Sequence, residues 1–447
     1  MPISPARAAA FDLLMRIEQQ DAYASEILHS KQYEKLSNVD HGLTTELVMG
    51  VLRWRSSLDE EIGRFSDKAV NKLDLEVLTA LRLGSYQLVF LNRVPERAAV
   101  HESVELVKRA RKKSAVPFAN AVLRKLAASP DRGLVELRKY EREPMRAADL
   151  SRQLAHPLWL VERWIQEFGF ANAQKICAND QGPPWPSIRL ADPHVEAELK
   201  REEVDLAPGR LLGSARRVQS GNVAATRAFV EGRVAIQDEA SQLVGLIVGK
   251  GSRILDCCAA PGGKTRILAA QNPNSSVVAL ELHPHRASLL RKLVAARNVD
   301  VIQSDVREFT AEKGFDRLLA DVPCSGTGTL AHNPEIKLRL KLEDLADLQE
   351  CQLAILCSAM RLAVPGARLV YSTCSLEREE NEIVIERALA SDPSFRILDA
   401  RLELNRLQGE GELVWKDLDS LLRDRFLRTI PGLQPCDGFF AAILQKD

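Results

Sequence analysis

Residues 252–265 read Ser252-Arg253-Ile254-Leu255-Asp256-Cys257-Cys258-Ala259-Ala260-Pro261-Gly262-Gly263-Lys264-Thr265. A short apolar run ends in an acid, passes through a turn of small residues and opens into an apolar pattern of helical spacing. That order predicts a strand, a tight turn and a helix start. In a doubly wound α/β sheet such a turn lets a ligand approach the backbone and the N-terminal amides of the helix. We therefore expect a cofactor site at this turn.

Two other interpretations of the turn compete with a cofactor site. A P-loop needs a glycine five positions before Gly263, where this chain has Cys258, so a nucleotide triphosphate site is not expected. A helix-entry turn without any ligand is the plain alternative, and a pair of glycines alone does not exclude it. The pattern downstream of the turn argues against this alternative.

Short apolar runs alternate with helical stretches downstream of the turn. We expect strands at 277–280, 301–302, 315–320 and 368–371, and helices at 285–297 and 345–364. The alternation predicts an open, mostly parallel sheet, in which ligands lie beyond the carboxyl ends of the strands. The residues that close the expected strands are Asp256, Glu281, Asp305, Asp321 and Cys374. A single acid would be interpreted as a helix cap, whereas four in series favour a ligand site.

The positions of two of these acids favour an adenosine-bearing cofactor. Glu281 lies about 20 residues after the glycine turn, the spacing at which an acid accepts hydrogen bonds from ribose hydroxyls. Asp305 is expected to receive the adenine amino group or its neighbouring amide. No GxGxxG motif with the spacing of a nicotinamide site occurs in the carboxyl-terminal sequence.

Two cysteines close the last two of the expected strands, Cys324 after Asp321 and Cys374 after Thr373. If these strands are neighbours, their ends lie roughly 5 Å apart. Carbon 5 of cytosine accepts a methyl group once a thiolate has added to carbon 6, an acid at ring nitrogen 3 stabilises the developing charge, and a base then removes the carbon-5 proton. Asp321, Cys324 and Cys374 offer these three roles. The alternatives are that the cysteines serve as small hydrophobic residues or form a disulfide.

In the N-terminal third, from residue 5 to about 128, apolar residues recur at helical spacing almost throughout. One of the expected helices ends in the basic cluster 108–113, KRARKK. A solvated helix end is the alternative interpretation of that cluster. The motifs LRLGSYQL (81–88), Val94-Pro95, HESVELVK (101–108) and FANAVL (118–123) resemble those of the NusB-like all-helical RNA-binding domain. This resemblance favours contact between the cluster and RNA phosphates.

The middle of the chain is expected to be a linker followed by a small mixed domain. Residues 130–149 are charged and only weakly periodic, which is typical of a helix and linker, and strands are expected at 188–190 and 227–230. The small mixed domain has four basic residues that are candidates for lining a channel for an RNA strand, namely Arg189, Arg210, Arg216 and Arg217. Scattered surface charge is the alternative interpretation.

The carboxyl-terminal motifs resemble those of RNA 5-methylcytosine methyltransferases. They are the glycine turn itself, DVPCSGTG (321–328), YSTCS (371–375) with EENE (379–382), and DGFF (437–440). With the NusB-like part in front, the chain resembles the bacterial Sun/Fmu family, which methylates 16S ribosomal RNA with S-adenosylmethionine. The resemblance implies an all-α NusB-like domain (1–140), a small mixed α+β linker domain (141–235) and a Rossmann-like α/β methyltransferase domain (236–447).

The same resemblance implies roles for individual residues. Cys374 would be the nucleophile and Cys324 would assist proton removal and product release, although the DNA enzymes use the cysteine of the Pro-Cys motif, which makes Cys324 the rival nucleophile. Asp321 would serve both the reaction and the cofactor. The cofactor-binding residues would be Cys258, Ala259, Ala260, Pro261, Gly262, Gly263, Lys264, Glu281, Asp305 and Asp321.

Composition limits the partners and the environment. The 61 Lys and Arg equal the 61 Asp and Glu, so contact with RNA must come from local patches. Charged residues interrupt the apolar residues of the first 20 positions, which argues against a signal peptide, and no apolar run has the length of a membrane span. The eight cysteines include no CxxC pair, the spacing that would indicate a zinc site. We expect a cytoplasmic monomer that binds 16S ribosomal RNA or a small-subunit assembly intermediate and uses neither a membrane nor a metal; the same chemistry on transfer RNA and a non-catalytic RNA-binding assembly factor are the alternatives.

Overall fold

The computed structural model describes residues 3–447 apart from residues 21, 29–32, 34, 130–145, 191, 193 and 295. The chain forms two compact units, Met1–Pro183 with Leu330–Arg339, and Pro184–Thr329 with Leu340–Asp447. The domain limits expected at 140 and 235 stay a prediction. The first limit and most of the expected helix and linker over 130–149 lie outside the described residues, and the middle segment contributes to both units. No helix in the described part of the chain is long and apolar enough to cross a membrane.

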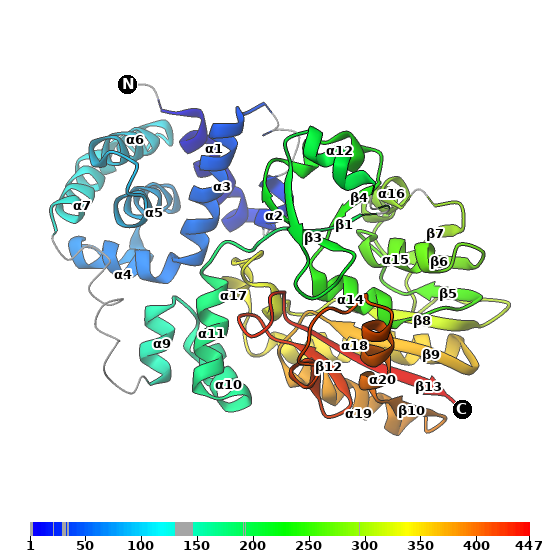
Figure 1. Cartoon of the computed structure of the whole chain (residues 1–447). Coiled ribbons are helices and arrows are strands. Elements are labelled where there is room, and N and C mark those ends of the chain that lie inside the picture. The colour runs from blue at the N-terminus through cyan, green and yellow to red at the C-terminus, as the bar shows by residue number, and fades with distance from the viewer. Residues whose placement is uncertain are drawn as a thin grey trace. The chain divides into compact units, whose positions relative to one another are not determined.

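Helices build the first unit as the structure describes it, which confirms the all-helical fold expected for the N-terminal part (Figure 1). Every residue from Val77 to Leu88 of α5 is buried, and a helix that is buried all round lies at the centre of a bundle. The central helix α5 spans Leu75–Phe90, and the other helices of this part are α1 (Pro5–Gln20), α2 (Ala24–Leu28), α3 (Asn38–Arg53), α4 (Arg55–Phe65), α6 (Glu96–Arg109) and α7 (Val116–Ala128).

Three further helices and a later piece of chain complete the first unit. The helices are α9 (Ala147–Gln153), α10 (Leu158–Phe168) and α11 (Phe170–Asp180), and the later piece carries α17 (Ile336–Arg339). Glu335 accepts a hydrogen bond from the Ala24 amide at 2.8 Å, and the Arg339 guanidinium donates to the carbonyls of Ile17 and Ala22 at 2.6 and 2.9 Å. The segment Leu330–Arg339, which follows soon after Cys324, thus folds with the N-terminal helices. Nothing in the sequence had indicated this.

A small antiparallel sheet begins the second unit, in the strand order β2 (Asp205–Pro208), β3 (Ala215–Ser220), β1 (Ser187–Leu190), β4 (Val234–Ile236). The strand expected at 188–190 is confirmed. The strand expected at 227–230 is wrong, because Arg227–Val230 forms the short helix α13. The Thr226 hydroxyl accepts a hydrogen bond from the Phe229 amide at 3.3 Å and so caps this helix.

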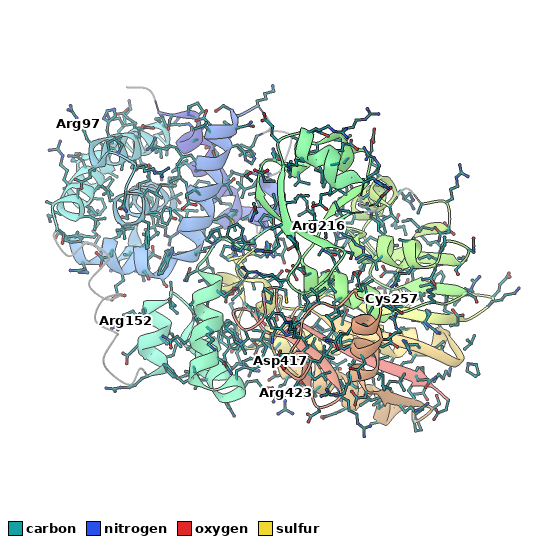
Figure 2. The ribbon with its side chains drawn as sticks, in the orientation of Figure 1. Arg97, Arg152, Arg216, Cys257, Asp417 and Arg423 are labelled. Carbon is teal, nitrogen blue, oxygen red and sulfur yellow. The ribbon has the colours of Figure 1, made fainter. Side chains whose placement is uncertain are left out.

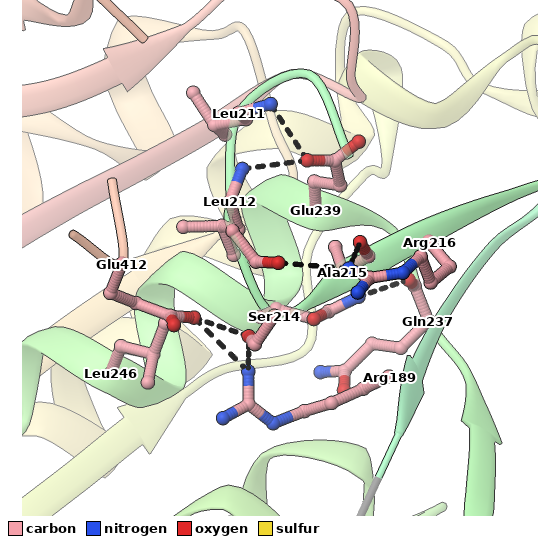
Figure 3. A network of polar contacts seen from close by, with 12 residues as sticks. Arg189, Leu211, Leu212, Ser214, Ala215, Arg216, Gln237, Glu239, Leu246 and Glu412 are labelled. Carbon is pink, nitrogen blue, oxygen red and sulfur yellow. Dashed lines mark hydrogen bonds and ion pairs between the residues drawn. The ribbon is translucent and has the colours of Figure 1, made fainter. Parts of the chain in front are cut away.

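Polar contacts tie the small sheet to the rest of the second unit (Figure 3). Glu239, the first residue of α14 (Glu239–Ile247), accepts hydrogen bonds from the amides of Leu211 and Leu212 at 2.7 and 2.8 Å. Arg189 donates to the Ser214 hydroxyl at 2.7 Å and lies 3.4 Å from Glu412. Since protein partners occupy this guanidinium, the contacts favour a structural role for Arg189 over an RNA channel.

A large sheet forms the core of the second unit, with the described strands in the order β11-β12-β13-β9-β8-β5-β6-β7 and β10 paired to β13 (Figure 1). Its parallel part consists of β5 (Arg253–Asp256), β6 (Ser276–Glu281), β7 (Val299–Gln303), β8 (Phe315–Asp321) and β9 (Ala363–Thr373). Its antiparallel part consists of β10 (Phe395–Leu398), β11 (Leu422–Arg423), β12 (Phe426–Thr429) and β13 (Phe439–Lys446). The intervening helices include α15 (Gly263–Gln271), α16 (Pro284–Leu293), α18 (Asp344–Leu362), α19 (Glu382–Ser391) and α20 (Ala400–Gly409). The α/β fold and the mostly parallel arrangement of the expected strands are confirmed.

Candidate active site

The glycine turn joins β5 to α15 as expected. Gly262 precedes the helix with a φ of 110°, and a Cβ on it would lie 2.4 Å from Cγ2 of Val294, so only glycine fits there. The Thr265 hydroxyl in the first turn of α15 reaches back to Oδ2 of Asp256 at 2.7 Å. This bond ties the end of the strand to the start of the helix and gives the turn a fixed shape.

A pocket of about 220 Å³ opens over this turn. All seven residues from Cys258 to Lys264 line it, together with Asp256 and Asp321. By contrast, the neighbouring Cys257 is 3% exposed and packs in the core (Figure 2), the environment of a small hydrophobic residue.

Two buried polar atoms belong to residues that line this pocket and have no hydrogen-bond partner within the described chain. They are Oδ1 of Asp256 and Oε1 of Gln237. Burial raises the pKa of Asp256 to about 7, against the hydrogen bond from Thr265, which lowers it. Buried polar atoms without partners are costly, so these two acceptors fit a site that receives donors from a bound molecule.

The other residues that line the pocket were not predicted. They come from the small sheet, α13 and neighbouring helices, and are Phe229, Ala235, Ile236, Gln237, Ser241, Arg266 and Leu293. No signal in the sequence indicates that Gln237, between a short strand and the start of a helix, reaches this pocket.

Lys264 and Asp321 were both expected to contact the cofactor, and the structure pairs them. The Lys264 ammonium lies 2.8 Å from Oδ2 of Asp321 and 4.9 Å from the centre of the Phe439 ring. Oδ1 of Asp321 accepts a hydrogen bond from the Ser372 hydroxyl at 2.7 Å. Asp321 therefore lines the pocket and also binds β9 two residues before Cys374.

Glu281 and Asp305 close their strands or lie just beyond them, but neither is among the residues that line this pocket. Glu281 accepts from the His283 amide at 2.9 Å and lies 3.9 Å from Arg286. The hydrogen bonds from Arg307 hold the pKa of the Asp305 carboxyl below its usual value. Their roles toward a cofactor stay a prediction.

Cys324 and Cys374 lie side by side, with 3.4 Å between their sulfur atoms. The parallel pairing of β8 and β9, with Asp321 opposite Ser372, brings the two strand ends together. The structure has them as two separate thiols, because a disulfide would hold the sulfurs about 2 Å apart. The hydrogen bond with Cys374, burial and the negative charges of Cys374 and Glu380 raise the pKa of Cys324 well above its ordinary value.

Two family models match this chain, each over a different part of it. Residues 245–445 match the family described as 16S rRNA methyltransferase RsmB/F, and residues 4–128 match the NusB family. A probable ribosomal RNA small subunit methyltransferase B of Bacillus subtilis is 33% identical over 98% of both chains. The chain belongs to the ribosomal RNA small subunit methyltransferase B family.

Other relatives agree with this membership. A ribosomal RNA small subunit methyltransferase B of Pseudomonas syringae is 34% identical over 82% of this chain and 83% of its own. The solved structure of PH0851 superposes with a TM-score of 0.79 and 23% identity, covering 100% of this chain and 99% of its own. A methyltransferase homolog from Pyrococcus horikoshii gives a TM-score of 0.55 at 22% identity, over 67% of this chain and 99% of its own. The two structural likenesses show the fold.

Some cations of the basic cluster 108–113 in the NusB-like part form ion pairs with acids of the first unit. Arg109 pairs with Asp12 at 2.8 Å, and Lys112 pairs with Asp74 at 2.9 Å. These pairs are largely exposed, and exposed pairs contribute little, so RNA phosphates can compete for the same cations. The RNA-binding role of the cluster stays a prediction.

Proposed function

We propose that this member of the family transfers a methyl group from S-adenosylmethionine to carbon 5 of a cytosine in 16S ribosomal RNA, through a covalent bond between Cys374 and carbon 6. The observation that carries the proposal is the pair of thiols, 3.4 Å apart just beyond the ends of β8 and β9. Neither thiol lines the pocket on the glycine turn, but Asp321 at the end of β8 does and binds Ser372, two residues before Cys374. A reaction that needs one thiol to add and a second group to assist its release is well served by this arrangement.

The pocket residues are suited to hold the methyl donor. The backbone of Cys258–Lys264 would face it, and the free oxygens of Asp256 and Gln237 would accept its hydrogen-bond donors. We assign further contacts to Glu281 and Asp305, as the family resemblance implies. When bound, S-adenosylmethionine would supply an activated methyl group at its sulfonium, and the electron pair of the broken S–CH3 bond would stay on the sulfur as a neutral thioether.

The protein residues carry the steps on the cytosine. The Cys374 thiolate adds to carbon 6, and the electron pair of the C5–C6 double bond becomes available at carbon 5 for the methyl group. With help from Cys324, a base then takes the proton from carbon 5, the electron pair of that C–H bond restores the double bond, and the C6–S bond breaks to return the Cys374 thiolate. Asp321, acting as an acid, would donate a hydrogen bond to ring nitrogen 3 and so stabilise the negative charge that develops there.

The target base must leave its stack to reach the thiols, since carbon 6 is covered in a stacked helix. We assign RNA contacts to the NusB-like part and its basic cluster, and we expect the enzyme to act as a monomer in the cytoplasm on ribosomal RNA or a small-subunit assembly intermediate.

Methyl transfer to defined RNAs tests this proposal. The protein is incubated with tritiated S-adenosylmethionine and unmodified 16S RNA or transfer RNA, and the nucleosides are identified by mass spectrometry. We expect 5-methylcytidine in 16S RNA, none with Cys374→Ala, and wild-type activity with the matched control Cys357→Ala on α18. Label in transfer RNA alone would overturn the substrate, another modified nucleoside would overturn the chemistry, and no label in either RNA would favour a non-catalytic binder.

A further inference from the structure

Glu380 is a fully buried carboxylate that lies between the two cysteine loops. It ends the short helix η5 (Arg378–Glu380) and has no exposed surface. Four donors converge on it: the amide and the hydroxyl of Ser325, the hydroxyl of Ser375, and the side-chain amide of Gln352 at 2.8 Å. An ionised carboxylate only accepts hydrogen bonds and can take about four, so this environment fits an anion. None of the ion pairs in the described chain involves it.

The donors on Glu380 have a specific place in the chain. Ser325 directly follows Cys324, and Ser375 directly follows Cys374. The Ser325 amide lies 2.7 Å from Oε1, both hydroxyls share Oε2, and the two hydroxyls are 3.1 Å apart. One carboxylate thus binds the residue after each of the two thiols.

Neighbouring bonds fix Glu380 itself. The Tyr371 hydroxyl of β9 donates to the Glu380 carbonyl at 2.6 Å, and the amide of Gln352 on α18 also donates to the Pro323 carbonyl at 2.9 Å. The side chain of Asn381 donates to the Ser375 carbonyl at 2.9 Å. Strand, helix and loop therefore hold the carboxylate in one position.

We propose that Glu380 is a positioning residue, which holds Cys324 and Cys374 at hydrogen-bonding distance by binding the serine that follows each of them. The proposal rests on the proposed function for the roles of the two cysteines. It adds a group that touches neither substrate nor cofactor and acts through Ser325 and Ser375.

The charge of Glu380 has a second consequence at the thiols. The ionisable groups that face Cys324 are Cys374, Glu380 and Tyr371. The hydrogen bond with Cys374 and burial raise the pKa of Cys324, and the buried charge of Glu380 adds to this shift because a nearby anion disfavours the thiolate. The carboxylate therefore disfavours Cys324 as the nucleophile.

The test replaces Glu380 by glutamine, which keeps the volume of the side chain and removes its charge. The matched control is Glu386→Gln, an exposed carboxylate on α19. Alkylation of each cysteine by iodoacetamide is followed as a function of pH by peptide mass spectrometry, without RNA, and kcat and KM are measured with 16S RNA. Binding of S-adenosylmethionine verifies that each variant is folded.

We expect Glu380→Gln to shift the alkylation of Cys324 to lower pH, whereas a residue with only a structural role would leave that midpoint in place. We expect kcat to fall on the order of 10- to 100-fold with KM for RNA unchanged, since a small misplacement of reacting groups costs rate rather than binding. An unchanged Cys324 profile or an unchanged kcat would overturn the proposal. The profile needs no RNA, so a wild type that fails to methylate cytosine would overturn the proposed function separately.

Combining substitutions tests whether Glu380 acts through the serines. Ser325→Ala with Ser375→Ala should lower kcat as Glu380→Gln does, and the triple variant should be no slower than the slower of the two, because they break the same linkage. Additive losses would mean that Glu380 acts by another route and would contradict the proposal.

Discussion

Asp256 offers a prediction in which stability and ligand binding move in opposite directions. The substitution is Asp256→Asn, which keeps the size of the side chain and the acceptor for the Thr265 hydroxyl but removes the charge. Asp256 is 1% exposed, and its Oδ1 has no partner within the described residues. We expect the variant to be more stable without ligand and to bind S-adenosylmethionine more weakly.

The size of the effect follows from the pKa. Burial raises the pKa of Asp256 from 3.8 to about 7, and a shift of about three units corresponds to about 4 kcal/mol. The folded state then holds a proton that the unfolded state has released, so wild-type stability falls as pH rises from about 4 to about 7 and stays level above. Asparagine removes this loss, but its amide leaves a buried donor unpaired at about 1–3 kcal/mol. A net gain of about 1–3 kcal/mol is expected above pH 7, and none at pH 4.

Denaturant unfolding of the ligand-free protein across this pH range measures the effect. The two unfolding free energies should diverge as pH rises, while calorimetry should show at least about tenfold weaker S-adenosylmethionine binding for the variant, the cost of one lost charged hydrogen bond. Asp316→Asn, a carboxylate on β8 outside the pocket, serves as the control. Parallel curves of unfolding free energy against pH for wild type and Asp256→Asn would show that burial does not raise the pKa of Asp256.

Three further predictions concern the turn, the pocket and the first unit. Gly262→Ala should lower the unfolding free energy by about 2–4 kcal/mol, from left-handed backbone strain and a clash with Val294; an unchanged denaturation midpoint would contradict the close approach. Lys264→Met removes the ammonium that pairs with Asp321. Calorimetry should show that S-adenosylmethionine binds about tenfold or more weakly to this variant, and the exposed Lys250→Met serves as the control. Burial lowers the pKa of Lys337 from 10.5 to about 7. Between these two pH values the folded state has lost a proton that the unfolded state keeps. The unfolding free energy of the wild type should therefore rise by about 1.4 kcal/mol per pH unit because of this residue. Lys337→Met should lack this rise. Equal slopes of unfolding free energy against pH for wild type and variant, measured by denaturation, would show that Lys337 is not buried as an amine.

The sequence predicted those parts of the site that lie on the ends of strands. The apolar run, the small-residue turn and the helical pattern of 252–265 placed β5, Gly262 and α15 correctly, because strand, turn and helix start each have a local residue signature. The pairing of Cys324 with Cys374 followed from the rule that neighbouring parallel strands end at one edge of a sheet.

What the sequence could not supply depends on tertiary contacts. The strand expected at 227–230 is helix α13, since the cap from Thr226 outweighs the preference of Phe229 and Val230 for a strand. Glu380 lies in a charged run that resembles a solvated helix start, and only the fold shows that it is buried between two serines. Likewise, no local pattern indicates that Leu330–Arg339 folds with the N-terminal helices or that Gln237 reaches the pocket.

The proposed reaction makes Cys374 the nucleophile and Cys324 the residue that assists release. Denaturing gels of protein incubated with unmodified 16S RNA and S-adenosylmethionine test it most directly, comparing wild type, Cys324→Ala, Cys374→Ala, the double variant and the control Cys357→Ala. We expect a covalent protein–RNA band that accumulates in Cys324→Ala and disappears when Cys374 is also replaced. A band that accumulates in Cys374→Ala and requires Cys324 would contradict it.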